Sequence, residues 1–83
     1  MPNIIIYTTA FCPYCVHAKR LLTHKNIEFT EIDVGKEPEK RSEMLQKSQQ
    51  RTVPQIFNGD KHIGDCMQLY DFESEGKLDT LLA

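Results

Sequence analysis

Two cysteines, Cys12 and Cys15, lie three positions apart in the segment AFCPYC. Two thiols at this spacing can form a reversible disulfide, supply half of a metal site, or be two small buried residues. Pro13 directly follows the first cysteine, and proline is favoured at the first position of a helix. The spacing therefore predicts that Cys12 caps the start of a helix and that Cys15 lies within its first turn.

A sulfur at a helix cap faces the free backbone N–H groups of the first turn, which here include those of Tyr14 and Cys15. These donors and the positive end of the helix dipole favour the thiolate over the thiol, so we expect Cys12 to be the nucleophile. Helix geometry brings Cα atoms three residues apart to within ~5 Å, which suits a disulfide. Cys15 is then expected to attack a mixed disulfide formed on Cys12.

Two other interpretations of the cysteine pair remain open. Unpaired cysteine is among the most often buried residue types, so both thiols could be structural. A zinc site would need Cys66 and His62 as further ligands, but HIGDC is not a common second ligand pair. A cysteine at a helix start after a strand is exposed and electropositive, which favours the redox interpretation, and we expect no bound metal.

The elements around the cysteines follow from residue patterns. NIIIYT, residues 3–8, is apolar and β-branched, which predicts a central strand covered on both faces. Residues 13–25 carry apolar positions at helical spacing. Residues 27–34, IEFTEIDV, predict a second strand, and residues 37–48 predict a polar helix with a thin buried stripe, chiefly Met44 and Leu45.

The second half of the chain predicts a hairpin and a helix. PQIF and KHIG flank Asn58-Gly59, a dipeptide typical of tight β-turns. A third helix is expected from about Cys66, and a last helical turn holds Leu78 and Leu82. The predicted order is βαβαββα, an α/β fold with a four-stranded mixed sheet and helices on both faces.

Composition limits the possible functions. Eighty-three residues suit a single domain spanning 1–83. A net charge of -2 supplies no general basic field, so we expect neither nucleic acid nor membrane partners. The apolar run at residues 4–6 is too short for a membrane span. Three cysteines, an odd number, suit a reducing compartment, which predicts a cytoplasmic protein.

The chain resembles the dithiol glutaredoxins over its whole length, in YTTAFCPYC, RTVPQIF and HIGDC. This resemblance implies a thioredoxin-like fold and glutathione-dependent reduction of protein disulfides and glutathionylated proteins. Glutathione would be the reducing co-substrate and a partner. The family also carries a cis peptide bond at the position of Pro54, whereas the residues alone predict trans, since only ~5 to 6% of X–Pro bonds are cis.

The resemblance further implies a glutathione site. Thr52, Val53 and Pro54 would offer a backbone edge to the cysteine moiety of glutathione, and Tyr14 would shape the groove beside the sulfur. Arg41 would bind the glycine carboxylate, with Arg51 as a second candidate. The alternative for Arg41 is a solvated position on a helix face.

The γ-glutamyl end would lie against the third helix, where the N–H groups of Asp65, Cys66 and Met67 follow Gly64. Many relatives carry Gly-Gly at positions 64–65 and acidic residues where this chain has Met67-Gln68. Asp65 either binds the ligand's ammonium instead or caps the helix. Cys66 is expected to be a helix-start residue near the site, open to glutathionylation if exposed.

A second departure lies beside the nucleophile, where Thr9 replaces a lysine common in the family. The helix dipole must then carry more of the thiolate stabilisation.

One alternative function is a thioredoxin-like reductase recharged by a flavin reductase. Another is a module in which two glutathiones and two copies of Cys12 hold an iron-sulfur cluster, which Pro13 and Cys15 disfavour. We expect a monomer acting on disulfide-containing or glutathionylated proteins.

Overall fold

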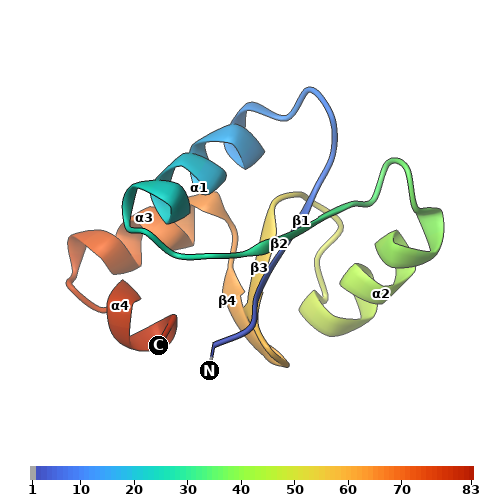
Figure 1. Cartoon of the computed structure of the whole chain (residues 1–83). Coiled ribbons are helices and arrows are strands. Elements are labelled where there is room, and N and C mark those ends of the chain that lie inside the picture. The colour runs from blue at the N-terminus through green and yellow to red at the C-terminus, as the bar shows by residue number, and fades with distance from the viewer. Residues whose placement is uncertain (1) are drawn as a thin grey trace.

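The structure, a computed structural model, describes residues 2–83. Its elements follow the predicted order, and a short helix lies at the end of the chain where a last helical turn was predicted (Figure 1). They are β1 (Ile4–Thr8), α1 (Pro13–His24), β2 (Thr30–Asp33), α2 (Pro38–Ser48), β3 (Gln55–Asn58), β4 (Lys61–Gly64), α3 (Cys66–Ser74) and α4 (Leu78–Leu81). Within residues 2–83, no helix is both long enough and apolar enough to cross a bilayer.

The four strands form one mixed sheet in the order β2-β1-β3-β4. β1 pairs in parallel with β2 and antiparallel with β3, and β3 pairs antiparallel with β4. A parallel pair needs a crossover, which α1 supplies, whereas the β3–β4 pair needs only a turn. The predicted α/β fold with a mixed four-stranded sheet is confirmed; it is the thioredoxin-like fold.

Helices cover both faces of the sheet, with α1, α3 and α4 on one side and α2 on the other (Figure 1). Ile6 of β1 points into the larger core cluster with Leu22 and Leu69. Its neighbour Tyr7 points to the opposite face and packs with Met44 of α2. Because both faces are buried, β1 is apolar along nearly its whole length, as predicted.

Helix α2 contacts the sheet through a stripe that differs from the predicted one. Met44 and Ser48 are buried, whereas Leu45 is exposed. Residues four apart share a helix face, so Ser48 follows Met44 and Leu45 turns to solvent. The Ser48 hydroxyl is satisfied locally, since it donates to the Met44 carbonyl oxygen at 2.7 Å. The expectation that Leu45 is buried was wrong.

The predicted second strand and hairpin turn are each shifted. β2 is shorter than predicted, because Ile27 and Phe29 pack against the core before the strand pairing begins. Asn58 is the last residue of β3, and the two residues that connect the strands are Gly59 and Asp60. The Asn58 amide instead donates to the Leu81 carbonyl oxygen at 3.1 Å, so it ties the hairpin to the C-terminal segment.

Candidate active site

The first turn of α1 presents one backbone donor to the sulfur of Cys12. Cys12 is the N-cap of the helix, with extended backbone (φ -113°, ψ 102°), and Pro13 is the first helical residue. The backbone N–H of Cys15 donates a hydrogen bond to Cys12 Sγ at 3.1 Å. The Cys12 side chain is partly exposed. A donor that points at a sulfur, at the positive end of a helix, stabilises the thiolate.

Cys15 has the opposite environment. Its side chain is 1% exposed. Burial raises the pKa of the Cys15 thiol to about 12, and its hydrogen bond with Cys12 also favours the protonated form. All three cysteines, Cys66 included, are unpaired. The two cysteines of AFCPYC therefore differ as the predicted roles require, with an accessible sulfur in front of a buried thiol that keeps its proton.

The loop before β3 lies against the nucleophile. The Val53–Pro54 peptide bond is cis, and the Val53 carbonyl oxygen is 3.9 Å from Cys12 Sγ, where it accepts a hydrogen bond only while Cys12 is protonated. The family resemblance implied this isomer. The trans bond predicted from the residues alone was wrong, because the general preference for trans says nothing about the tertiary contacts of this loop.

A groove of about 290 Å³ runs beside the sulfur. It contains six of the predicted glutathione-binding residues together with Met67: Tyr14, Thr52, Val53, Pro54, Asp65 and Cys66. Gly64, a seventh, is the last residue of β4 and lies two positions before α3. A neighbouring hollow of about 300 Å³ shares Tyr14, Cys66 and Met67 with the groove, which widens the concave surface toward α3.

The start of α3 differs from the expected open helix end. Asp65 Oδ1 accepts from the Gln68 backbone N–H at 3.0 Å, and Gln68 Oε1 accepts from the Asp65 N–H at 3.1 Å. The two residues form a capping box. Asp65 therefore caps the helix. Its own N–H, which we expected to be free for a ligand carboxylate, is occupied, and only those of Cys66 and Met67 remain for that role.

Cys66 lines the groove but offers little reactive surface. It is 5% exposed. Burial raises the pKa of the Cys66 thiol, and the charges of Asp65 and Cys12 raise it further. A buried, protonated thiol is a poor nucleophile. We expected Cys66 to be open to glutathionylation only if it is exposed, and it is buried.

The two arginines lie apart from the groove. Arg41 and Arg51 are exposed and line a separate hollow of about 270 Å³ with Met44 and Leu45. This hollow and the groove share no lining residue. Arg51 directly precedes Thr52, however, so one residue of each lining is adjacent to the other in the chain.

A lysine outside the predicted site lies on the other side of the thiols. Lys19, one turn after Cys15, lines a hollow of about 490 Å³ that also includes Cys12 and Cys15. Its ammonium group is 2.9 Å from Glu31, and its charge lowers the pKa of Cys15 slightly against the dominant effect of burial. Position 9 has no lysine, so Lys19 supplies a cation near the dithiol from α1.

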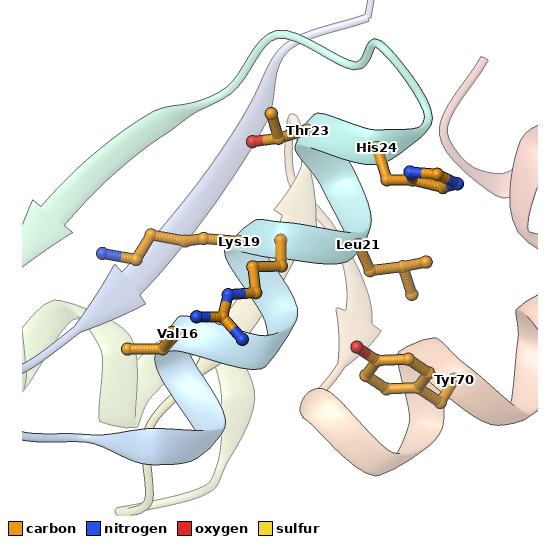
Figure 2. Close-up of a pocket in the computed structure, with 7 residues that line it drawn as sticks. Val16, Lys19, Leu21, Thr23, His24 and Tyr70 are labelled. Carbon is orange, nitrogen blue, oxygen red and sulfur yellow. The ribbon is translucent and has the colours of Figure 1, made fainter.

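The most spacious hollow described does not belong to the thiol site. It measures about 770 Å³ and lies along the outer surface of α1, where Leu21, His24 and Tyr70 line one side and Val16 and Lys19 the other (Figure 2). None of the residues predicted for catalysis or glutathione binding lines it. It shares Val16 and Lys19 with the hollow that contains Cys12 and Cys15, but neither cysteine lines it.

Gln55 and His62 were also missed as parts of the site. His62, named above only as a possible zinc ligand, is exposed, but its Nε2 lies 2.7 Å from Gln55 Oε1 and its ring packs on Phe57 with centroids 4.9 Å apart. Gln55 is 1% exposed and directly follows Pro54. In the sequence, the one available signal was a polar residue directly after the proline that begins a predicted buried strand.

Comparisons with known proteins agree with this geometry. A family model described as Glutaredoxin matches residues 4–63. A glutaredoxin of Pseudomonas aeruginosa is 49% identical over 83 residues, covering 100% of this chain and 99% of the relative. The solution structure of a Brucella melitensis glutaredoxin has a TM-score of 0.86 and 54% identity, covering 99% of this chain and 89% of that one. A crystal structure of a buckwheat glutaredoxin–glutathione complex has a TM-score of 0.88 and 30% identity, covering 98% and 76%.

A thioredoxin-like fold with a dithiol at the start of α1 defines a thiol-disulfide oxidoreductase. Within this class, the chain belongs to the glutaredoxin family. It is a glutathione-dependent thiol-disulfide oxidoreductase. This assignment disfavours the alternative of a reductase recharged by a flavin enzyme.

Proposed function

We propose that Cys12 and Cys15 perform this reaction as nucleophile and resolving thiol. The Cys12 thiolate attacks one sulfur of a substrate disulfide, the new bond forms on Cys12, and the other substrate sulfur leaves and takes a proton. Cys15 then loses its proton to solvent, attacks Cys12 Sγ and releases the second substrate thiol. One glutathione thiolate opens the Cys12–Cys15 disulfide and a second releases glutathione disulfide.

The observation that carries this assignment is the contrast between the two sulfurs. Cys12 Sγ receives the N–H of Cys15 at 3.1 Å, while Cys15 is buried and its pKa is raised to about 12. Attack requires a thiolate, so the accessible sulfur with the donor acts first. The buried thiol reacts only when a disulfide forms on the sulfur beside it.

We place glutathione in the groove between Tyr14, the Thr52–Pro54 loop and the start of α3. An extended tripeptide can pair with the backbone of Val53 as an added strand, with its sulfur beside Cys12. The N–H groups of Cys66 and Met67 are left for the γ-glutamyl carboxylate, because Gln68 occupies that of Asp65. The Asp65 carboxylate still carries a charge that attracts the ligand's ammonium.

The glycine carboxylate is assigned to the end of the groove next to Arg51, with Arg41 beyond it. Both arginines line the same hollow, and arginine binds carboxylates through two parallel hydrogen bonds. Arg51 is the nearer candidate because it adjoins Thr52 in the chain. A solvated Arg41 that only adds positive potential is the alternative.

The substrates we propose are disulfide-containing and glutathionylated proteins. Large apolar side chains close to Cys12 in the chain or lining the groove are exposed, namely Phe11, Tyr14, Val16 and Met67. Exposed apolar surface of this kind favours contact with a polypeptide. We propose that the protein acts as a monomer and without a metal. We place it in the cytoplasm, since the glutathione pool there can reduce its disulfide.

Three proteins test the proposed roles: the wild type, Cys12→Ser and Cys15→Ser. The turnover of a glutathionylated peptide and of a peptide disulfide is measured with glutathione as the reductant. Cys12→Ser is expected to lose both activities. Cys15→Ser is expected to keep the first and lose most of the second, because only the peptide disulfide needs a resolving thiol. Full activity in Cys12→Ser would refute the assignment.

A further inference from the structure

Gln55 is a buried amide directly behind the proposed glutathione edge. It is the first residue of β3, follows Pro54, and is 1% exposed. Its Nε2 donates to the Thr52 carbonyl oxygen at 3.0 Å and lies 3.3 Å from Thr52 Oγ1. Its Oε1 faces His62 Nε2 at 2.7 Å. A buried amide left unpaired is costly, so these contacts hold the side chain in one orientation.

The hydrogen-bond partners also determine which way the amide points. The Thr52 carbonyl oxygen can only accept, so the NH₂ group of Gln55 must face it. Gln55 Oε1 can only accept in turn, so His62 Nε2 must carry a hydrogen. Partial desolvation lowers the pKa of His62 although its side chain is exposed, and this favours the neutral ring. The contact with Gln55 Oε1 then places the hydrogen on Nε2. The chain of donors runs in one direction, from His62 through Gln55 to Thr52.

His62 is itself held in place by the sheet. It lies opposite Phe57 in the β3–β4 register, and its ring packs on Phe57 at 4.9 Å with 35° between the ring planes. The imidazole therefore has a packing partner on one side and a hydrogen-bond partner at Nε2. The edge strand β4 is in this way connected, through two side chains, to the loop beside the nucleophile.

We propose that Gln55 is a positioning residue for the reaction and that His62 orients it. Gln55 holds Thr52, and Thr52 carries the loop whose next carbonyl oxygen lies 3.9 Å from Cys12 Sγ. Displacing reacting groups by ~1 Å can cost about a hundredfold in rate, so a fixed loop matters for aligning sulfur atoms. The inference rests on the proposed docking of glutathione against Thr52–Pro54.

The test compares Gln55→Met with Tyr7→Phe. Tyr7 lies opposite Gln55 in the β1–β3 register. Its hydroxyl donates to Glu43 at 2.7 Å on the α2 side, so Tyr7→Phe also removes one side-chain hydrogen bond. Both variants are expected to lower Tm. Only Gln55→Met is expected to raise KM for a glutathionylated peptide. The expected rise is about tenfold, which corresponds to the free energy contributed by one buried hydrogen bond. Alkylation of Cys12 by iodoacetamide is expected to stay unchanged in both.

The conservative variant Gln55→Glu adds a signature that a purely structural role does not produce. Its carboxyl group repels the Thr52 carbonyl oxygen when ionised, and can donate a hydrogen bond to that oxygen when protonated. His62 Nε2 faces the same side chain at 2.7 Å and would stabilise the ionised carboxylate, so the comparison is made with His62→Phe as the common background. There the kcat/KM of Gln55→Glu relative to its parent is expected to recover as the pH falls from 8 to 5.5. The ratio for Gln55→Met should stay flat over the same range.

Three outcomes decide the proposal. Equal KM values for Gln55→Met, Tyr7→Phe and the wild type would overturn it and leave Gln55 as a structural residue. If Gln55→Met does not fold, His62→Phe keeps the packing on Phe57, removes the orienting bond, and is judged by the same rise in KM. A wild-type protein that does not turn over the glutathionylated peptide would instead refute the proposed glutathione site, whatever Gln55 does.

Discussion

Asp65 and Gln68 exchange two hydrogen bonds across the first turn of α3, at 3.0 Å and 3.1 Å. The exchange satisfies two backbone N–H groups that a helix start otherwise leaves free. It also occupies the Asp65 N–H, one of the donors that a ligand carboxylate would use. Asp65 therefore caps the helix, and the role that we propose for it in glutathione binding rests on its charge.

Replacing Asp65 separates the cap from the charge. Asp65→Ala removes the capping oxygen and is expected to lower the free energy of unfolding by ~1 kcal/mol, whereas Asp65→Asn keeps a capping oxygen and most of the stability. Both variants lose the carboxylate and should show a higher KM for glutathione. Urea denaturation and steady-state kinetics measure the two effects. Equal destabilisation by Ala and Asn would contradict the capping role.

Gly64 is constrained by the same turn. Its φ of +142° lies in a region that side chains rarely adopt, and a Cβ there would collide with the Gln68 side chain. Gly64→Ala is expected to destabilise the protein by more than ~1 kcal/mol, because strain and the displaced capping box add. Gly76→Ala, at φ +74° with open space around it, reports the strain alone. A smaller loss at position 64 than at position 76 would refute this account.

Phe11 stores backbone strain immediately before the nucleophile. Its φ is +59° and its side chain is fully exposed, so its ring contributes no burial that offsets the strain. Phe11→Asn is expected to raise the free energy of unfolding by up to ~1 kcal/mol, since asparagine tolerates this conformation. Phe11→Ala removes the ring but keeps the unfavourable φ, and should leave stability nearly unchanged. Thermal denaturation of both variants distinguishes strain from loss of the aromatic group.

Glu31 links stability to pH. Its hydrogen bonds with Lys19 and then with Thr8 lower the pKa of its carboxyl group. A depressed folded-state pKa stabilises the protein above the unfolded value, and this contribution is lost as the pH falls through the folded value. Glu31→Gln should therefore cost a few tenths of a kcal/mol at pH 7, since the pair is partly exposed. The difference should be smaller in urea titrations near pH 3 than at pH 7, and a difference that does not shrink would contradict the linkage.

The residue pattern predicted much of the fold because burial on both faces leaves a clear signal. The apolar run of β1 and the proline at the start of α1 lie where the residue pattern predicts them. The Cys12 cap followed from the same reasoning. These features depend on local chemistry or on one-dimensional periodicity, which a single sequence contains.

Other parts of the site depend on contacts between distant segments. The cis bond before Pro54 and the partnership of Gln55 with His62 are set by tertiary packing. Asn58 carried a strong turn signal, but its side chain is used to hold the C-terminal segment. Asp65 was correctly described as a possible cap, yet residue types alone offered no means of choosing between cap and ligand. The role of each of these residues is set by the tertiary contacts that it makes, and the residue type alone does not predict those contacts.

The central claim is that Cys12 is the accessible nucleophile, with the backbone N–H of Cys15 directed at its sulfur, and that Cys15 is a buried thiol that keeps its proton. The most direct measurement is iodoacetamide alkylation of the reduced wild type at pH 7, with peptide mapping of the modified sites over time. The account predicts that Cys12 is modified first and that Cys15 reacts much more slowly. Modification of Cys15 as fast as that of Cys12 would contradict the account.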